Sequence, residues 1–178
     1  MPNWCENQVR INGPVDKIYN MAKAVEEERL LEYLVPVEGT NLDRTSAWGT
    51  KWDITEPHME HNIEDGVIEV SFMTAWGPPD ACFCTYLMEN DDVTIENYFY
   101  EPGNAFAGID SESVEIPDKS DADEWESDPM LKELDDVFCI REQMIEWETY
   151  EIAENQESWD TQLTHRYLEQ SKKALLKC

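Results

Sequence analysis

The chain has 178 residues and carries 40 acidic against 13 basic side chains, which gives a formal net charge of −27 and a sequence pI near 4.1. A surface this acidic repels phosphate groups, which argues against binding to DNA, RNA or anionic membranes. Hydrophobic residues make up 41% of the chain and tryptophan occurs seven times, too often for a disordered acidic segment, so we expect a folded core.

The apolar runs and the cysteines bear on where the protein works. No apolar run reaches the roughly 18 residues that a membrane span requires, and the N-terminal residues do not have the pattern of a secretion signal. The five cysteines are odd in number and too sparse for a secreted disulfide scaffold. We therefore expect free thiols and a cytoplasmic protein.

The first half of the chain alternates strand-like and helix-like segments. Gln8–Asn12 alternates apolar and polar residues and is predicted as a strand, whereas apolar residues three and four apart predict a helix at Val15–Val25. Leu30–Val37 is apolar but contains Pro36, which favours a short helix or an extended connection. A second strand is predicted at Gly66–Thr74, because apolar and polar residues alternate there.

The same periodicities predict a helix at Asp80–Glu89 and two further strands at Val93–Tyr100 and Ala105–Ile109. A Glu101-Pro-Gly-Asn104 turn separates these two strands. This order of elements predicts an α+β sandwich, with helices on one face of a mainly antiparallel sheet.

The character of the chain changes at Asp110. Residues 110–160 contain 19 acidic and 3 basic side chains, so much of the negative charge is concentrated there. Ser111–Trp125 is predicted as a loop or short hairpin arm, and Asp128-Pro129 has the pattern of a helix start. We expect a helix from there to about Glu154 and another at Trp159–Lys177. The chain would thus divide into an α+β domain, 1–109, and an acidic helical extension, 110–178, packed on the first.

The expected first helix of the extension presents a narrow acidic ridge. On a wheel of about 100° per residue, four carboxylates fall close to one line, with apolar residues on both sides: Asp128, Asp135, Glu142 and Glu146. The apolar residues predict that this helix packs on another part of the protein and leaves the ridge exposed.

Three tryptophan-containing motifs occur in the first half: Pro2-Asn-Trp-Cys-Glu-Asn7, Trp48-Gly-Thr-Lys-Trp-Asp53 and Phe72-Met-Thr-Ala-Trp-Gly-Pro-Pro79. In this order they closely resemble the signature of the YubB ferredoxin-like domain family, found largely on phages and plasmids. Gly77 stands where that family more commonly has serine. The resemblance covers about residues 1–109. It implies a ferredoxin-like α+β fold and a mobile element in a bacterial cytoplasm, but it assigns no activity to Lys51, Asp53 or Trp76.

Two side-chain sets in the first half have alternative interpretations. Lys51 and Asp53 could form an acid–base pair, or the neighbouring Trp48, Trp52 and Trp76 could build a core along which Lys51 lies and pairs with Asp53. The structural interpretation is favoured, because nothing else in the sequence completes a reaction site. A second set of residues includes zinc ligand types, although their spacing fits no familiar zinc pattern: His58, His61, Cys82 and Cys84.

Other enzyme and metal motifs are missing from the sequence. It contains no glycine-rich phosphate loop and no nucleophile elbow. Asp118–Asp128 is rich in oxygen ligands but lacks the glycine and glutamate positions of a calcium-binding helix-loop-helix. We therefore expect no enzyme activity, no cofactor and no dedicated metal site.

The crowded carboxylates after Asp110 are the remaining candidate site. The partner-binding residues predicted from the sequence are Asp118, Asp121, Asp123, Glu124, Glu126, Asp128, Asp135, Glu142 and Glu146. The leading hypothesis is a phage or plasmid inhibitor whose acidic surface mimics nucleic acid and blocks a basic DNA- or RNA-binding site of a host defence enzyme, either a CRISPR effector or a restriction system. The first alternative is an interaction or assembly module anchored by Trp125, Trp147 and Trp159. The second is an enzyme that uses Lys51 and Asp53.

Overall fold

The computed structural model describes residues 3–147 and divides the chain into two compact units, Met1–Phe138 and Cys139–Cys178. Each unit is treated by itself below. In the first unit the elements follow in the order β1 (Trp4–Asn12), α1 (Val15–Glu26), α2 (Leu30–Leu34), α3 (Asn41–Trp48), β2 (Thr55–Asn62), the short 3₁₀ turn η1 (Ile63–Asp65), β3 (Val67–Ala75), α4 (Asp80–Glu89), β4 (Thr94–Glu101), β5 (Phe106–Ile109), β6 (Glu112–Glu115), α5 (Ala122–Ser127) and α6 (Pro129–Phe138).

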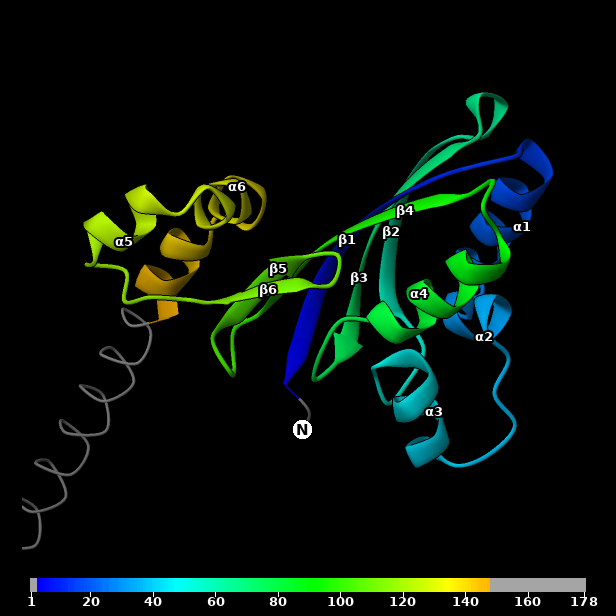
Figure 1. The fold of residues 1–178 in the computed structure, drawn as a ribbon, viewed down its shortest axis with the longest axis horizontal. Coiled ribbons are helices and arrows are strands. Elements are labelled where there is room, and N and C mark those ends of the chain that lie inside the picture. The colour runs from blue at the N-terminus through cyan, green and yellow to red at the C-terminus, as the bar shows by residue number, and fades with distance from the viewer. Residues whose placement is uncertain (1–2, 148–178) are drawn as a thin grey trace, which may run out of the picture. The chain divides into compact units, whose positions relative to one another are not determined.

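The six strands form one sheet in the order β2-β3-β1-β4-β5-β6, and every neighbouring pair is antiparallel. The first four strands have the ferredoxin-like arrangement, in which α1 follows β1, α4 follows β3, and β1 lies between β3 and β4 (Figure 1). The β5–β6 hairpin extends the sheet beyond β4. The predicted α+β ferredoxin-like fold is therefore confirmed.

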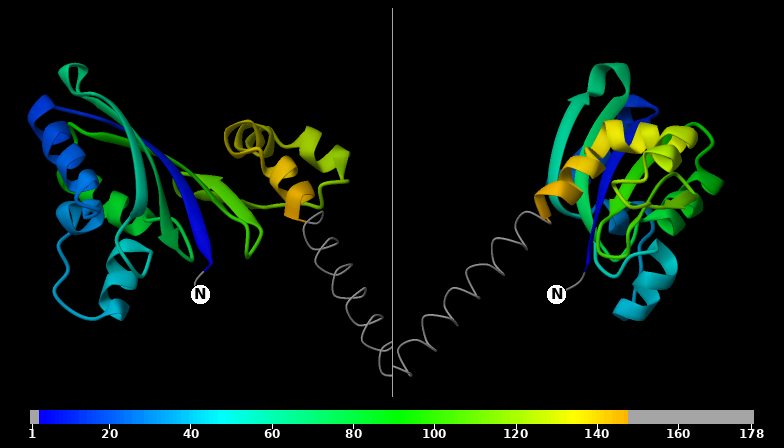
Figure 2. Two further views of the ribbon diagram at one scale, coloured as in Figure 1. Left: turned by 180° about the vertical axis from the view of Figure 1, so that it is seen from behind. Right: turned by 90° about the vertical axis from the view of Figure 1, so that its left-hand side faces the viewer.

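The hydrophobic core lies between the sheet and helices α1 to α4, which gather on one side of it (Figure 2). Along β1 the buried residues alternate with partly or fully exposed ones, as expected for a strand with one covered face. Val9 and Ile11 on this strand pack with Ile18 and Met21 of α1 and with Trp48 at the end of α3. The alternation read from the sequence thus reflects this single buried face.

The segment after β6 packs against the other face of the sheet. Tyr98 and Tyr100 of β4 lie opposite Gln8 and Glu6, which are β1 positions directed away from the core. The ring of Tyr100 contacts Phe138 of α6 at a centroid distance of 6.0 Å. The Tyr98 hydroxyl donates a hydrogen bond of 2.7 Å to Glu133 of the same helix. Helix α6 therefore belongs with the first unit.

The division of the chain differs from the one expected from composition. Ile109 lies within the β5–β6 hairpin, where it pairs with Glu112, and the first unit continues to Phe138. The change in charge at Asp110 therefore does not coincide with a structural boundary. Backbone hydrogen bonding between β5 and β6 joins the two sides of that change.

The expected long helix from Asp128 to Glu154 is wrong. Helix α6 ends at Phe138, Cys139 has a left-handed φ of 52°, and helical structure resumes over residues 140–147. The same apolar spacing continues on both sides of the break, and neither glycine nor proline marks it in the sequence. Glu142 and Glu146 consequently belong to the second unit, and the predicted four-residue ridge is not formed on a single helix. The expected helix at Trp159–Lys177 lies outside the described residues.

Helix α3 and strand β2 were not predicted. Strand β2 is at the edge of the sheet, contains Pro57 and has a bulge between Thr55 and His58, where Glu56 has a φ of 51°. An edge strand pairs on one side only and tolerates proline, bulges and polar residues on its exposed face. Its sequence therefore lacks the apolar alternation that identified β3.

Candidate functional site

The loop and helix around α5 are held in place by Trp125. This side chain is only 2% exposed, and its indole Nε1 donates a hydrogen bond of 3.1 Å to the carbonyl oxygen of Asp118. Helix α6 contributes Leu131, Leu134 and Phe138 to the buried interior of the same unit. The predicted role of Trp125 as an interface anchor is therefore wrong, because the residue fixes this segment internally. Of the other two predicted anchors, Trp147 is 62% exposed in the second unit, and Trp159 lies outside the described residues.

Three carboxylates of the segment stabilise its turns. Asp121 caps α5 by accepting a hydrogen bond from the backbone N–H of Glu124 at 3.3 Å. Asp128 accepts one from the backbone N–H of Met130 at 2.8 Å, at the start of α6. Asp118 accepts two hydrogen bonds from Ser120, and these lower the pKa of its carboxyl group. The loop conformation is thus defined by side chains that also carry the charge.

The carboxylates of this segment are directed to solvent. The five predicted site residues that are exposed in the first unit are Asp118, Asp121, Asp123, Glu124 and Glu126. Glu126 forms an ion pair of 3.1 Å with Lys132. Asp128 and Asp135 are half-buried, whereas Glu142 and Glu146 are exposed in the second unit. The structure therefore brings together the carboxylates of residues 118–128, which we call the acidic segment.

A second surface is formed where the three tryptophan motifs meet. The ring centroids of Trp4 and Trp52 are 6.2 Å apart, and those of Trp52 and Trp76 are 6.4 Å apart. The Lys51 ammonium lies 4.7 Å from the Trp52 centroid and 4.9 Å from that of Trp76. The three indoles are 38%, 36% and 47% exposed, so this group of four residues, the tryptophan cluster, forms a surface patch.

The backbone around the tryptophan cluster is tightly connected. The Trp76 N–H donates to the Asn3 carbonyl at 2.9 Å, and Trp76 itself has a left-handed φ of 71°. The Thr50 hydroxyl donates to the Ala75 carbonyl and accepts from the Ala75 N–H, both at 3.0 Å. These bonds join the first and second motifs to the third. The order of the motifs in the sequence was the only signal for this convergence.

Lys51 and Asp53 do not pair in the structure. The Asp53 carboxylate accepts hydrogen bonds from the backbone N–H groups of Leu31 at 2.9 Å, Glu32 at 2.9 Å and Ile54 at 2.8 Å. Burial raises the pKa of Asp53, and these three hydrogen bonds act in the opposite direction. Asp53 thus anchors the start of α2, while Lys51 lies over the indoles. The favoured structural interpretation was right that Lys51 lies against tryptophans. It was wrong about its partner and about the core, because Trp52 and Trp76 are exposed.

The four potential zinc ligands do not form a site. His58 and His61 are on the edge strand β2, whereas Cys82 and Cys84 are on α4. Cys82 is fully buried, its thiol lies 3.8 Å from the carbonyl of Leu31, and burial raises its pKa. Across residues 3–147, no group of three or more His, Cys, Asp or Glu residues is arranged to hold a metal ion. The same holds for the oxygen-rich residues Asp118–Asp128.

A cavity of about 380 Å³ lies on the face of the sheet opposite helices α1 to α4. Its wall includes Arg10, Glu69 and Tyr98, together with Val137 of α6. Arg10 is paired with Glu69 at 3.2 Å, and the Tyr98 hydroxyl is bonded to Glu133 at 2.7 Å. The arginine and the tyrosine of this wall are thus already paired within the protein.

Comparisons with known proteins leave the function open. No family model and no curated protein matches the chain. Among solved structures, it is similar to the crystal structure of the protein api92 from Yersinia pseudotuberculosis, described under the family model DUF1281, with 20% sequence identity and a TM-score of 0.35. That match covers 47% of this chain and 32% of the other. In the described part of the chain, no helix has the length and apolar character needed to cross a membrane.

Proposed function

We propose that this protein is a non-enzymatic inhibitor that mimics nucleic acid and binds the basic nucleic-acid-binding site of a host defence enzyme, a CRISPR effector or a restriction system. The observation that carries the proposal is the acidic segment, in which five exposed carboxylates lie on a loop and helix fixed by the buried Trp125. Resemblance of the three tryptophan motifs to a phage and plasmid family supports the setting in a bacterial cytoplasm.

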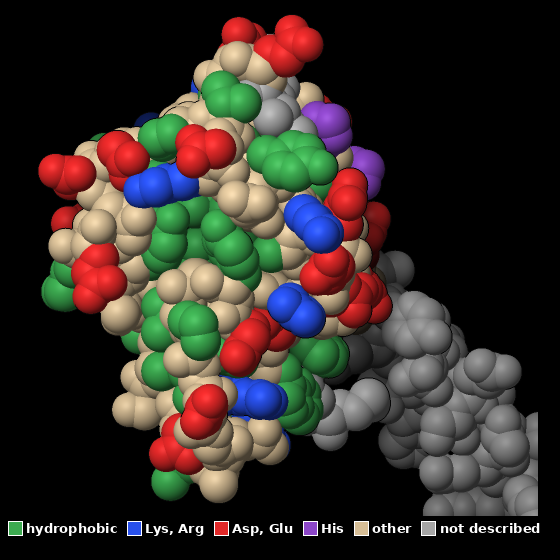
Figure 3. All heavy atoms as spheres, turned by 90° about the vertical axis from the view of Figure 1, so that its right-hand side faces the viewer, with side chains coloured by type: hydrophobic (Ala, Val, Ile, Leu, Met, Phe, Trp, Pro, Cys, Tyr) green, Lys and Arg blue, Asp and Glu red, His purple; other side chains and the backbone are tan. Residues whose placement is uncertain are grey.

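The distribution of charge supports the acidic segment as the surface that mimics nucleic acid. Residues 110–138 contain 12 acidic and 2 basic side chains, Lys119 and Lys132, of which Lys132 pairs with Glu126. On the face formed by α1 to α4, basic side chains lie among the acidic ones (Figure 3). There, Lys17 pairs with Asp92 at 2.6 Å and Lys23 with Glu27 at 3.9 Å. The acidic segment is thus much less neutralised than the helical face.

The mechanism is competition for a basic groove. Exposed carboxylates attract arginine and lysine side chains over a distance set by the ionic strength, which raises the association rate. Once in contact, ion pairs and hydrogen bonds to the carboxylates occupy the positions that phosphates would take. A fixed loop presents these carboxylates without the ordering cost that a disordered acidic tail would pay on binding.

The tryptophan cluster favours a second candidate function, a protein–protein interaction or assembly module. Exposed tryptophans on a rigid backbone are typical of interface centres. In this alternative, the indoles of Trp4, Trp52 and Trp76 contact the partner and the acidic segment serves solubility. The two functions differ in which surface is needed for binding.

A capture experiment distinguishes them. The full chain is immobilised and exposed to a bacterial lysate freed of nucleic acid, and bound proteins are eluted either with duplex DNA or with salt raised from about 0.1 to 0.5 M. The mimic predicts partners that are released by DNA and by salt, and that lose DNA binding when the free protein is added. Partners that resist both treatments, and still bind DNA beside the protein, would contradict it.

Charge-matched variants identify the surface. The combined D121N/D123N/E124Q/E126Q variant changes the net charge from −27 to −23 (−27 + 4) and keeps an asparagine at the α5 cap. The control E26Q/E28Q/E38Q/E89Q makes the same change at exposed glutamates in the first half. The mimic predicts loss of capture only with the first variant. Loss with W52A/W76A, and retention with both charge variants, would instead support the interaction module.

A further inference from the structure

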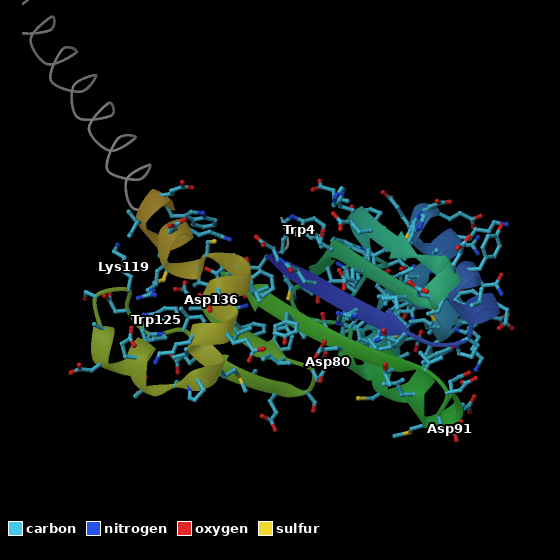
Figure 4. All side chains as sticks on the ribbon, turned by 90° about the horizontal axis from the view of Figure 1, so that it is seen from above. Trp4, Asp80, Asp91, Lys119, Trp125 and Asp136 are labelled. Atoms are coloured by element: carbon cyan, nitrogen blue, oxygen red, sulfur yellow. The ribbon has the colours of Figure 1, made fainter. Side chains whose placement is uncertain are left out.

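A pocket of about 190 Å³ lies between α4, β4 and the turn that joins β5 to β6. Asp80, the first residue of α4, is labelled in Figure 4. The pocket is lined by Asp80, Phe83, Cys84, Leu87, Ile95, Asn97, Asp110 and Ser111. None of these residues belongs to the acidic segment or to the tryptophan cluster, so the site can be tested without reference to the proposed function.

The innermost polar group of the pocket is Asn97, which is only 1% exposed. Its Nδ2 donates to the Asn7 side-chain oxygen at 3.4 Å, and its side chain is also hydrogen-bonded to the Asp80 carboxylate. The Asn97 Oδ1 is buried without a hydrogen-bond partner. A buried amide oxygen left without a donor costs about 1–3 kcal/mol, so this atom points to a missing donor from a ligand.

Asp110 brings a second carboxylate to the pocket. Its backbone has a left-handed φ of 54°, its N–H donates to the Asn97 carbonyl at 2.7 Å, and its Oδ1 accepts from the Asn97 N–H at 2.9 Å. These two bonds fix the turn against β4 and leave the second carboxylate oxygen for other contacts. A non-glycine residue in this conformation is uncommon and persists only where its surroundings impose it.

The pocket has an excess of negative charge and of acceptors. Burial raises the pKa of Asp80 to about 6, and the charge of Asp110 adds to the increase. No lysine or arginine is among the lining residues of the described chain. Two carboxylates therefore line a space that lacks a cationic donor, and the buried Asn97 side chain forms part of its wall. A ligand with a positive charge and several N–H groups would satisfy the carboxylates.

The opposite part of the wall is apolar and consists of Phe83, Leu87 and Ile95. This combination argues against a divalent metal, since calcium takes six to eight oxygen ligands and magnesium retains an octahedral shell. An ammonium group on an aliphatic chain matches both parts of the wall, because its N–H groups meet the oxygens and its methylenes meet the apolar side chains. We propose that the pocket between α4, β4 and the β5–β6 turn binds an alkylammonium group.

The test is a titration of the isotope-labelled full chain with n-butylammonium chloride at pH 7.5, followed by amide chemical shifts. We expect saturable shifts at Asp80, Asn97, Asp110 and Ser111. The neutral n-butanol has the same alkyl chain and should not produce them, and neither should calcium or magnesium chloride. Absence of saturable shifts, equal shifts with n-butanol, or tighter binding of the divalent ions would each overturn the proposal.

Variants of the two carboxylates test whether each contributes to the affinity for the ammonium group. D80N and D110N each remove one charge-assisted hydrogen bond, so each should weaken binding at least about tenfold. Asparagine tolerates the left-handed backbone at position 110, and it removes a desolvated charge at position 80. The control D91N changes an exposed aspartate outside the pocket, labelled in Figure 4, and should leave the affinity unchanged. Equal weakening by D91N would show bulk charge attraction only and would refute the site.

Two further probes separate the sources of such a group. Spermidine presents the ammonium as a free polyamine, whereas Nα-acetyl-lysine amide presents it as the side chain of a protein partner. Tighter binding of one of the two identifies the natural source, and binding of either supports the proposal. Lowering the pH from 7.5 to 5 protonates Asp80, whose pKa is about 6, and should weaken both.

Discussion

The hydrogen bonds of Asp53 give a prediction that separates the structural role of this residue from a catalytic one. Asp53 Oδ1 accepts from the N–H groups of Leu31 and Ile54, and Oδ2 accepts from that of Glu32. Replacing Asp53 with alanine removes both oxygens and leaves these donors without their partner. Helix α2 is five residues long, and its N-cap residue Arg29 makes no side-chain capping hydrogen bond, so the start of the helix depends on the Asp53 carboxylate.

The size of the expected loss of stability follows from the backbone N–H groups that lose their acceptor. Loss of a capping residue typically costs about 1 kcal/mol, and buried donors without a partner add about 1–3 kcal/mol. We expect Asp53→Ala to lower the free energy of unfolding by about 3 kcal/mol. Asp53→Asn keeps one carbonyl oxygen, which can serve Leu31 and Ile54, and loses the bond to Glu32. It should cost about 1 kcal/mol.

The assay is urea unfolding of each variant at pH 7.5, followed by tryptophan fluorescence and circular dichroism. Lys51→Met serves as the control, because it removes only the contact of the ammonium with the exposed indoles and should cost no more than about 1 kcal/mol. The interpretation fails if Asp53→Ala changes the unfolding free energy by less than the asparagine variant. A cost for Lys51→Met equal to that of Asp53→Ala would also refute it, because it would indicate a coupled pair.

Three other outcomes are expected from the same structure. The folded-state pKa of Asp80 is raised from 3.8 to about 6, so the Asp80 carboxyl group keeps its proton in the folded protein over this range. The contribution of this group to stability therefore falls as the pH rises from about 4 to 6. Urea unfolding should show that Asp80→Asn has a free energy of unfolding up to about 3 kcal/mol above that of the wild type at pH 7.5 and equal to it at pH 3. Trp125→Ala should lower the unfolding free energy by about 3–5 kcal/mol, and retention of the wild-type value would show that this indole does not hold the acidic segment. Iodoacetamide should alkylate the exposed Cys84 and Cys139 in the native protein. It should spare Cys5 and Cys82, because burial blocks access to these thiols and raises their pKa values. Peptide mass mapping measures the labelling, and labelling of Cys82 at the rate of Cys84 would contradict this expectation.

Elements with a regular apolar pattern were predictable from the sequence. Helix α4 has the bounds that its spacing indicates, Asp80–Glu89, and α1 differs from its prediction by one residue at the end. Strand β3 was found for the same reason, because its buried and exposed positions alternate. These patterns arise from the burial of one face, and they are local properties of consecutive residues. Strand β2 lacks the pattern because it is an edge strand, and it was therefore missed.

The candidate sites depended on contacts between distant residues. The acidic segment was evident from the composition, yet its fixed conformation rests on Trp125, which the sequence suggested as an interface anchor. Because the helix breaks at Cys139, Glu142 and Glu146 are not part of the predicted ridge. No residue type in the sequence indicates this break. The proximity of Asp80 and Asp110 at one pocket beside Asn97 was equally hidden, because these residues come from a helix, a turn and a strand.

What the sequence alone determined is therefore the α+β class, the main helices and strands, and the uneven distribution of charge. The helices and strands follow from the periodicity of apolar residues along the chain, and the charge distribution follows from counting acidic and basic side chains in each segment. Tertiary structure alone decided which carboxylates share a surface, which polar atoms are buried without a partner, and where three tryptophans meet. Those properties depend on distances between residues far apart in the chain, and only packing of the sheet against its helices sets such distances.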